Sequence, residues 1–133
     1  MKKVKKIISV QADPVEKINV NTDTTFLLLL EAQKRGYQIF WYETKGLSLI
    51  NKKVTASGNF VTLFKNKRNY FKKKQLTQID LSRSKYLLIR QNPPFNMDYI
   101  NSTLYLEKLK KSVKVINNPS AIRNISEKFY SSK

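Results

Sequence analysis

The chain has 133 residues, 41% of them hydrophobic, which is enough for one domain over 1–133 with its own core. It contains no cysteine and no histidine, which excludes the common zinc ligand sets, thiolate nucleophiles and an imidazole base. The net charge of +17, from 26 basic and 9 acidic residues, raises the possibility of a nucleic-acid or acidic-membrane partner. No segment approaches the roughly 18 uninterrupted apolar residues of a membrane span, so a cytoplasmic protein is expected.

The first unit along the chain has the order strand, loop, helix, strand. A β-branched run over 4–10 predicts a buried parallel strand, which a turn at Asp13-Pro14 ends. Apolar residues at helical spacing continue to Gly36, which is interpreted as a C′ glycine. An aromatic strand over 37–42, whose Trp41 is interpreted as a core residue, follows directly, so a βαβ unit is expected.

The middle of the chain departs from this pattern. Short apolar runs over 47–50, 54–56 and 60–64 are separated by turn residues, including Gly58-Asn59. They predict two or three short antiparallel strands joined by tight turns. The basic stretch 65–74 is expected to be a loop or an exposed helical turn.

The last third returns to the parallel pattern. The run 86–89 predicts a second buried strand, and Pro93-Pro94 must end it because proline cannot donate to a strand ladder. A helix over 99–111 and a strand over 113–116 are expected to follow. The alternation of strands and helices predicts a doubly wound α/β domain with an antiparallel excursion.

Two polar clusters lie where a parallel strand should lead into a helix, which is where open α/β sheets build ligand sites. The first contains Asp23, Thr24 and Thr25, which could receive an anionic or amide ligand at a helix start, although N-capping alone explains the same residues. The second is Arg90 at the end of an apolar strand, where its planar fork suits a carboxylate, although it could also be a surface cation. We predict that both clusters lie on one pocket at the edge of the sheet.

The spacing of the glycines and carboxylates excludes two other kinds of ligand site. The three glycines form no G-x-G-x-x-G or P-loop array, so the glycine-rich phosphate cradles are ruled out. The nine carboxylates include no D-x-D or E-x-N pair that would hold magnesium, so neither a metal site nor a complete phosphoryl-transfer site is expected.

Several blocks in a fixed order carry a family resemblance. They are Asp13-Pro14, the segment 19–37 with its Leu-Leu-Glu-Ala-Gln-Lys-Arg-Gly-Tyr ending, Arg90 with Pro93-Pro94-Phe95, and 115–119 followed by Arg123 and Glu127-Lys128. Over 4–42 and 80–130 the chain resembles the N-terminal domain of bacterial glutathione synthetase. The resemblance implies a Rossmann-like, three-layer domain of the pre-ATP-grasp type, with a mainly parallel sheet and a short antiparallel excursion.

The same resemblance implies an ATP-dependent ligase, glutathione synthase. The family joins γ-glutamylcysteine to glycine through an acyl phosphate, uses ATP and Mg²⁺, and usually assembles as a homo-oligomer. By matching positions, Thr22, Asp23, Thr24 and Phe26 would line the substrate pocket, Arg90 would engage a substrate carboxylate, and Lys128 would reach the nucleotide. No catalytic residue is expected here, since the ATP-grasp domain is not encoded in these residues, and the segment alone is expected to be inactive and to bind no cofactor.

Two functions of other classes stay open at this stage. One is a small basic protein that binds nucleic acid or another polyanion, but only five of the 26 basic residues are arginine, the residue on which base-edge readout depends. The other is an interaction module that self-associates through apolar surface. We expect no specific nucleic-acid partner and no membrane partner.

The net positive charge of the chain leads to one testable prediction. The chain should bind RNA or DNA non-specifically at low ionic strength and should have released most of it by about 0.2 M salt, because simple charge attraction depends on counterion release. Fluorescence anisotropy of a labelled oligonucleotide across a salt series measures this. Tight binding that survives at about 0.2 M salt would favour the polyanion-binding alternative.

Overall fold

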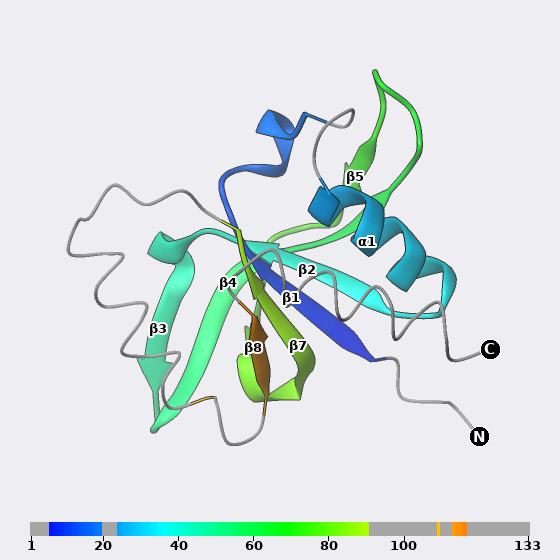
Figure 1. Cartoon of the computed structure of the whole chain (residues 1–133). Coiled ribbons are helices and arrows are strands. Elements are labelled where there is room, and N and C mark those ends of the chain that lie inside the picture. The colour runs from blue at the N-terminus through cyan, green and yellow to red at the C-terminus, as the bar shows by residue number, and fades with distance from the viewer. Residues whose placement is uncertain (1–5, 20–23, 91–108, 110–112, 117–133) are drawn as a thin grey trace.

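The computed structural model describes residues 6–19, 24–90, 109 and 113–116, and its strands form one connected sheet with helix α1 against one face (Figure 1). The strands are β1 (Ile7–Gln11), β2 (Gln38–Tyr42), β3 (Leu47–Ile50), β4 (Lys53–Leu63), β5 (Phe71–Lys73), β6 (Thr77–Asp80), β7 (Ser84–Ile89) and β8 (Lys114–Ile116). The helices are α1 (Thr24–Lys34) and the 3-10 turns η1 (Val15–Lys17), η2 (Thr44–Gly46) and η3 (Leu81–Arg83). No helix in the described part of the chain is long and apolar enough to cross a membrane.

Strand β1 is the centre of the parallel part of the sheet. The main path runs β3-β4-β2-β1-β7-β8, and β1 pairs in parallel with both β2 and β7, while β8 continues in parallel beyond β7. All five residues of β1 are buried. The strands predicted near the start of the chain, at 37–42, at 86–89 and at 113–116 are thus confirmed, and so is the mixed α/β fold with parallel and antiparallel parts.

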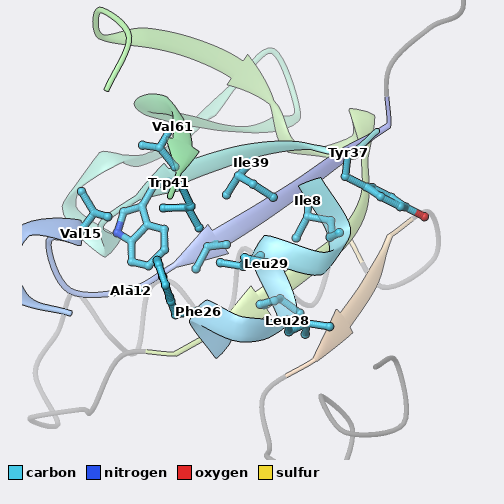
Figure 2. Packing of buried hydrophobic residues seen from close by; sticks show 14 of the residues in the cluster. Ile8, Ala12, Val15, Phe26, Leu28, Leu29, Tyr37, Ile39, Trp41 and Val61 are labelled. Atoms are coloured by element: carbon cyan, nitrogen blue, oxygen red, sulfur yellow. The ribbon is translucent and has the colours of Figure 1, made fainter. Parts of the chain in front are cut away.

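The two faces of β1 contribute to two apolar clusters. Ile8 and Val10 belong to the cluster that includes the inner face of α1, where Figure 2 shows Leu28 and Leu29 packed towards the sheet. Ile7 belongs to the second cluster, together with the helical residue Leu109. Because side chains alternate along a strand, the sheet buries apolar side chains on both faces. The rest of the helix predicted over 99–111 lies outside the described residues.

Helix α1 ends as the sequence predicts. Gly36 has a φ of 93°, its N–H donates to the carbonyl of Gln33 at 3.1 Å, and the N–H of Tyr37 donates to the carbonyl of Ala32 at 3.1 Å. These two bonds are the pair that defines a Schellman motif, in which glycine occupies the left-handed position without strain. The predicted N-cap of this helix, Asp23, lies outside the described residues.

Strands β3 and β4 form a hairpin with a two-residue turn. Asn51 and Lys52 have φ values of 51° and 65°, the left-handed values that a type I′ turn requires. Beyond this turn the sequence-based prediction is wrong, because 54–56 and 60–64 are not separate strands but belong mainly to the 11-residue β4. Gly58 lies within β4 and makes no turn, and a Cβ at this position would come within 2.4 Å of the Trp41 carbonyl oxygen. Glycine here permits close backbone approach.

Two further strands pair with β4. The stretch 65–74, predicted as a loop or helical turn, contains β5, which pairs with the second half of β4, and β6, which was not predicted, pairs with the first half. Their residues are largely polar or basic, so they carry no apolar periodicity. A long neighbouring strand can still satisfy their backbone groups, and lysines are tolerated on short outer strands.

The two glycines allow a matched stability test. Gly36→Ala should reduce the free energy of unfolding by about 1 kcal/mol, since nothing lies within 4 Å of the new Cβ and only the left-handed φ is penalised. Gly36→Asn should lose less, because asparagine tolerates this conformation. Gly58→Ala should cost more than Gly36→Ala, because its Cβ would meet backbone at 2.4 Å. Urea unfolding measures all three, and a Gly36→Ala variant as stable as the wild type would contradict the Schellman assignment.

Candidate functional site

The carboxyl ends of β1, β2 and β7 surround a cavity of about 190 Å³ next to the start of α1. The chain passes from β1 through α1 to β2 on one side of β1, whereas β7 lies on the other side. This is a topological switch point, where open α/β sheets leave a crevice for ligands. The polar and charged residues that line the cavity are Asp13, Lys17, Asn19, Thr25 and Arg90, and Trp41 supplies an aromatic wall.

Arg90 is held at this edge by the β1–β7 ladder. Ile89 is paired with Gln11 in register, and the N–H of Arg90 donates to the carbonyl of Gln11 at 2.8 Å. The preceding residues Leu87 and Leu88 are buried, so the strand is anchored up to the cavity. Arg90 itself is half-buried and lines the cavity, which is the position predicted from the sequence.

The segment after β1 is tied to β2. The N–H of Ala12 donates to the carbonyl of Tyr42 at 3.1 Å, and the indole Nε1 of Trp41 donates to the carbonyl of Asp13 at 2.9 Å. Trp41 therefore has two roles: its ring is buried in the core beside Ala12 and Val15, as Figure 2 shows, and its N–H fixes the backbone at Asp13.

The next turn of this segment is tied to the region around β5. Val15 is fully buried, and its carbonyl accepts a hydrogen bond from the Tyr70 hydroxyl at 2.8 Å. One residue later, Glu16 forms an ion pair with Lys73, with 2.6 Å between Oε2 and Nζ. These contacts hold η1, whose last residue, Lys17, lines the cavity.

Several pKa values follow from these contacts. The hydrogen bond from Lys73 lowers the pKa of Glu16. Burial, helped by the charge of Glu16, raises the pKa of Tyr70. Burial raises the pKa of Tyr42 far above its ordinary value, and this neutral hydroxyl donates to the Gln11 side-chain oxygen at 3.0 Å. The end of β1 is thus held by neutral hydrogen bonds as well as by the ladder.

The cavity has the chemistry of a binding site. It presents two cationic side chains, Lys17 and Arg90, against one carboxylate, Asp13, with the hydroxyl of Thr25 and the amide of Asn19 as further polar groups. Such a set can hold and orient a small ligand that carries carboxylates. Within the described ranges, no three His, Cys, Asp or Glu side chains are grouped so that they could hold a metal ion.

The structure places only some of the predicted site residues at this cavity. Thr25, the one member of the first polar cluster whose side chain is described, lines the same cavity as Arg90. Thr24 begins α1, but the structure does not describe its side chain. Thr22, Asp23 and Lys128 lie outside the described residues. Phe26 is buried in the core, where it meets the Tyr70 ring edge-on at 6.1 Å, and it does not line this cavity. The ligand contacts expected of these residues stay predictions.

Three residues of the cavity have no predicted role as ligands. Asp13 is interpreted from the sequence as part of a turn, and Lys17 and Asn19 as part of a polar loop. The rule that singles out Arg90 also applies to them, because they follow the carboxyl end of a buried parallel strand. The sequence therefore contains a pattern that predicts these residues at a ligand site, but a turn and a polar loop account for the same residues.

Comparison with known proteins gives one consistent result. The family model described as "Prokaryotic glutathione synthetase, N-terminal domain" matches residues 7–123. The chain is 37% identical over 123 residues to glutathione synthetase of Rhodopseudomonas palustris, which covers 92% of the chain and 39% of that protein. It is 38% identical over 130 residues to glutathione synthetase of Agrobacterium fabrum, covering 98% and 40%. Glutathione synthetase of Buchnera aphidicola subsp. Schizaphis graminum is 37% identical over 132 residues, covering 98% and 41%.

The ion pair that holds η1 can be tested by titration. Lys73→Met should raise the pKa of Glu16 towards 4.5, because the hydrogen bond from Lys73 is the main cause of its lowering. Since the pKa is lowered by folding, the pair stabilises the fold above the unfolded-state pKa, and this contribution is lost as the pH falls through the folded-state pKa. Both groups are partly exposed, so the stability effect should stay below about 1 kcal/mol.

NMR titration of the Glu16 carboxyl group measures this pKa in the wild type and in Lys73→Met. Lys72→Met is the matched control, because Lys72 is exposed and forms no ion pair with the described residues. An equal Glu16 pKa in the wild type and in Lys73→Met would show that the pair does not persist in solution.

Proposed function

Because this chain belongs to the family of prokaryotic glutathione synthetase N-terminal domains, we propose that it is the substrate-side domain of a glutathione synthetase. The proposed reaction joins γ-glutamylcysteine to glycine with ATP. The family match over residues 7–123 carries this proposal, and the cavity with Arg90 and Thr25 gives it a place in the fold. The chain spans 39–41% of the length of the three relatives described above.

The role proposed for the domain is to position the dipeptide. Arg90 would bind a substrate carboxylate through a charge-assisted hydrogen bond, and Thr25 would offer its hydroxyl at the start of α1. Thr22, Asp23, Thr24 and Phe26 stay proposed contacts from the family resemblance. Holding one reactant in a fixed orientation removes translational and rotational entropy from the reaction barrier. Arg90 follows the paired strand β7, and Thr25 lies in helix α1, which packs against the sheet. The cavity is therefore largely preorganised.

ATP and magnesium are assigned to other parts of the enzyme. When bound, ATP would supply the phosphoryl group that activates the dipeptide carboxyl, and magnesium would offset the negative charge of the phosphates. The described residues offer no cluster for a metal ion, and Lys128, the residue proposed to reach the nucleotide, lies outside them. We therefore assign no step of phosphoryl transfer to the described residues. A C-terminal ATP-grasp domain and a homo-oligomeric enzyme are part of the same proposal.

The proposal predicts the effect of removing Arg90. In a ligase of full family length, Arg90→Ala should lower kcat/KM for γ-glutamylcysteine by an amount equivalent to about 1.5–3 kcal/mol, the cost of a lost charge-assisted bond. Arg83→Ala is the matched control, since Arg83 is exposed on η3 and does not line the cavity. An unchanged kcat/KM in Arg90→Ala would remove this residue from the substrate site.

A further inference from the structure

We propose that Asp13 recognises a ligand ammonium group, while Lys17 and Arg90 recognise carboxylates of the same ligand. The cavity would then select a dipeptide with a free α-amino group over its N-acylated or deaminated analogues. This inference rests on the proposed function and adds to it a residue that determines specificity.

The position of Asp13 is fixed by its backbone. Its carbonyl accepts the Trp41 Nε1 hydrogen bond at 2.9 Å, and the N–H of the preceding Ala12 donates to the Tyr42 carbonyl at 3.1 Å. The side chain takes no part in either bond. Its carboxylate is therefore carried on an anchored backbone at the cavity wall and is exposed to solvent.

Asp13 differs from the other acidic residues of the described part of the chain, since three glutamates form ion pairs and Asp80 accepts a hydrogen bond from the Ser82 N–H at 2.9 Å. The chain has 26 basic and 9 acidic residues, so basic side chains far outnumber the carboxylates with which they could pair. In the described part of the chain, the ion pairs are Glu31 with Arg35, Glu43 with Lys45, and Glu16 with Lys73, and neither Asp13 nor Lys17 takes part in one. Both charges thus line the cavity without neutralising a described neighbour.

The charges of the cavity distinguish between ligand classes. A phosphate group would be attracted by Lys17 and Arg90 but repelled by Asp13. An amino-acid end with an ammonium group and carboxylates satisfies all three side chains. The apolar surface of Trp41 and Ile18 suits the methylene groups that separate such charges. At about 190 Å³ the cavity is smaller than the roughly 300–1,000 Å³ of sites for drug-sized ligands, so it suits a small ligand or one end of a longer ligand.

The single tryptophan of the chain provides the probe. Trp41 lines the cavity and donates its indole N–H to Asp13, so its ¹⁵N–¹H resonance should report occupancy directly. The 133-residue chain is titrated with γ-glutamylcysteine, with its N-acetyl derivative and with glutaryl-cysteine, which lacks the amino group. We expect the wild type to bind the free-amine dipeptide about tenfold more tightly than either analogue, a difference of about 1.4 kcal/mol.

Variants separate the three charges. Asp13→Asn should lose about tenfold in affinity for the free-amine dipeptide and leave both analogues unchanged, so the preference disappears. Asp13→Glu keeps the carboxylate and should keep a preference for the free amine. Lys17→Gln and Arg90→Ala should weaken all three ligands together. Glu31→Gln is the matched control, because it removes one acidic charge outside the cavity. A dispersed amide spectrum, with one sharp indole resonance, in each unliganded variant shows that the fold is intact.

The outcomes distinguish the two proposals. No response of the wild type to any of the three ligands would contradict dipeptide binding by this domain, and with it both proposals. A wild type that binds all three equally, or an Asp13→Asn variant that keeps the preference, would overturn the role of Asp13 alone. Inorganic phosphate that shifts the indole resonance at lower concentration than the dipeptide would also overturn the assignment, since it would identify a simple anion site.

Discussion

The burial of β1 between two parallel neighbours is the constraint on which the rest of the site depends. Every residue of the strand is buried, and its two edges are paired with β2 and β7. Parallel strands end in the same direction, so the carboxyl ends of all three strands meet at one edge of the sheet. The cavity, Arg90 and the segment after β1 all lie at this edge because the pairing of β1 with both neighbours fixes where the three strands end.

A second set of contacts makes this edge rigid. The segment after β1 runs over the surface, yet its backbone is bound by the Trp41 indole and the Tyr70 hydroxyl, at 2.9 Å and 2.8 Å. Each bond satisfies a polar group that would be costly to leave buried and unpaired. Cavity residues on the segment therefore do not depend on the segment's own conformational preference. A site that positions a reactant needs this kind of support.

The antiparallel part of the domain contributes to the site through these contacts. Strand β4 continues beyond Gly58 and pairs with β5, whose Lys73 forms the ion pair with Glu16. Tyr70, just before β5, holds Val15. The middle of the chain thus supports the segment that carries Asp13 and Lys17. The region proposed to contact substrate and the region that supports it are separate in sequence but joined in the fold.

The sequence by itself determined the elements whose signals are local. A β-branched run predicts β1, helical spacing that ends at Gly36 predicts α1, and an apolar strand followed by a single arginine predicts the place of Arg90. Only the tertiary structure decided that Gly58 lies within a strand, that basic residues form β5, and that Asp13, Lys17 and Arg90 share one cavity. The contacts responsible join residues as far apart as Val15 and Tyr70, 55 positions along the chain. Such contacts leave no periodic pattern in the sequence, because only the packed sheet brings the two segments together.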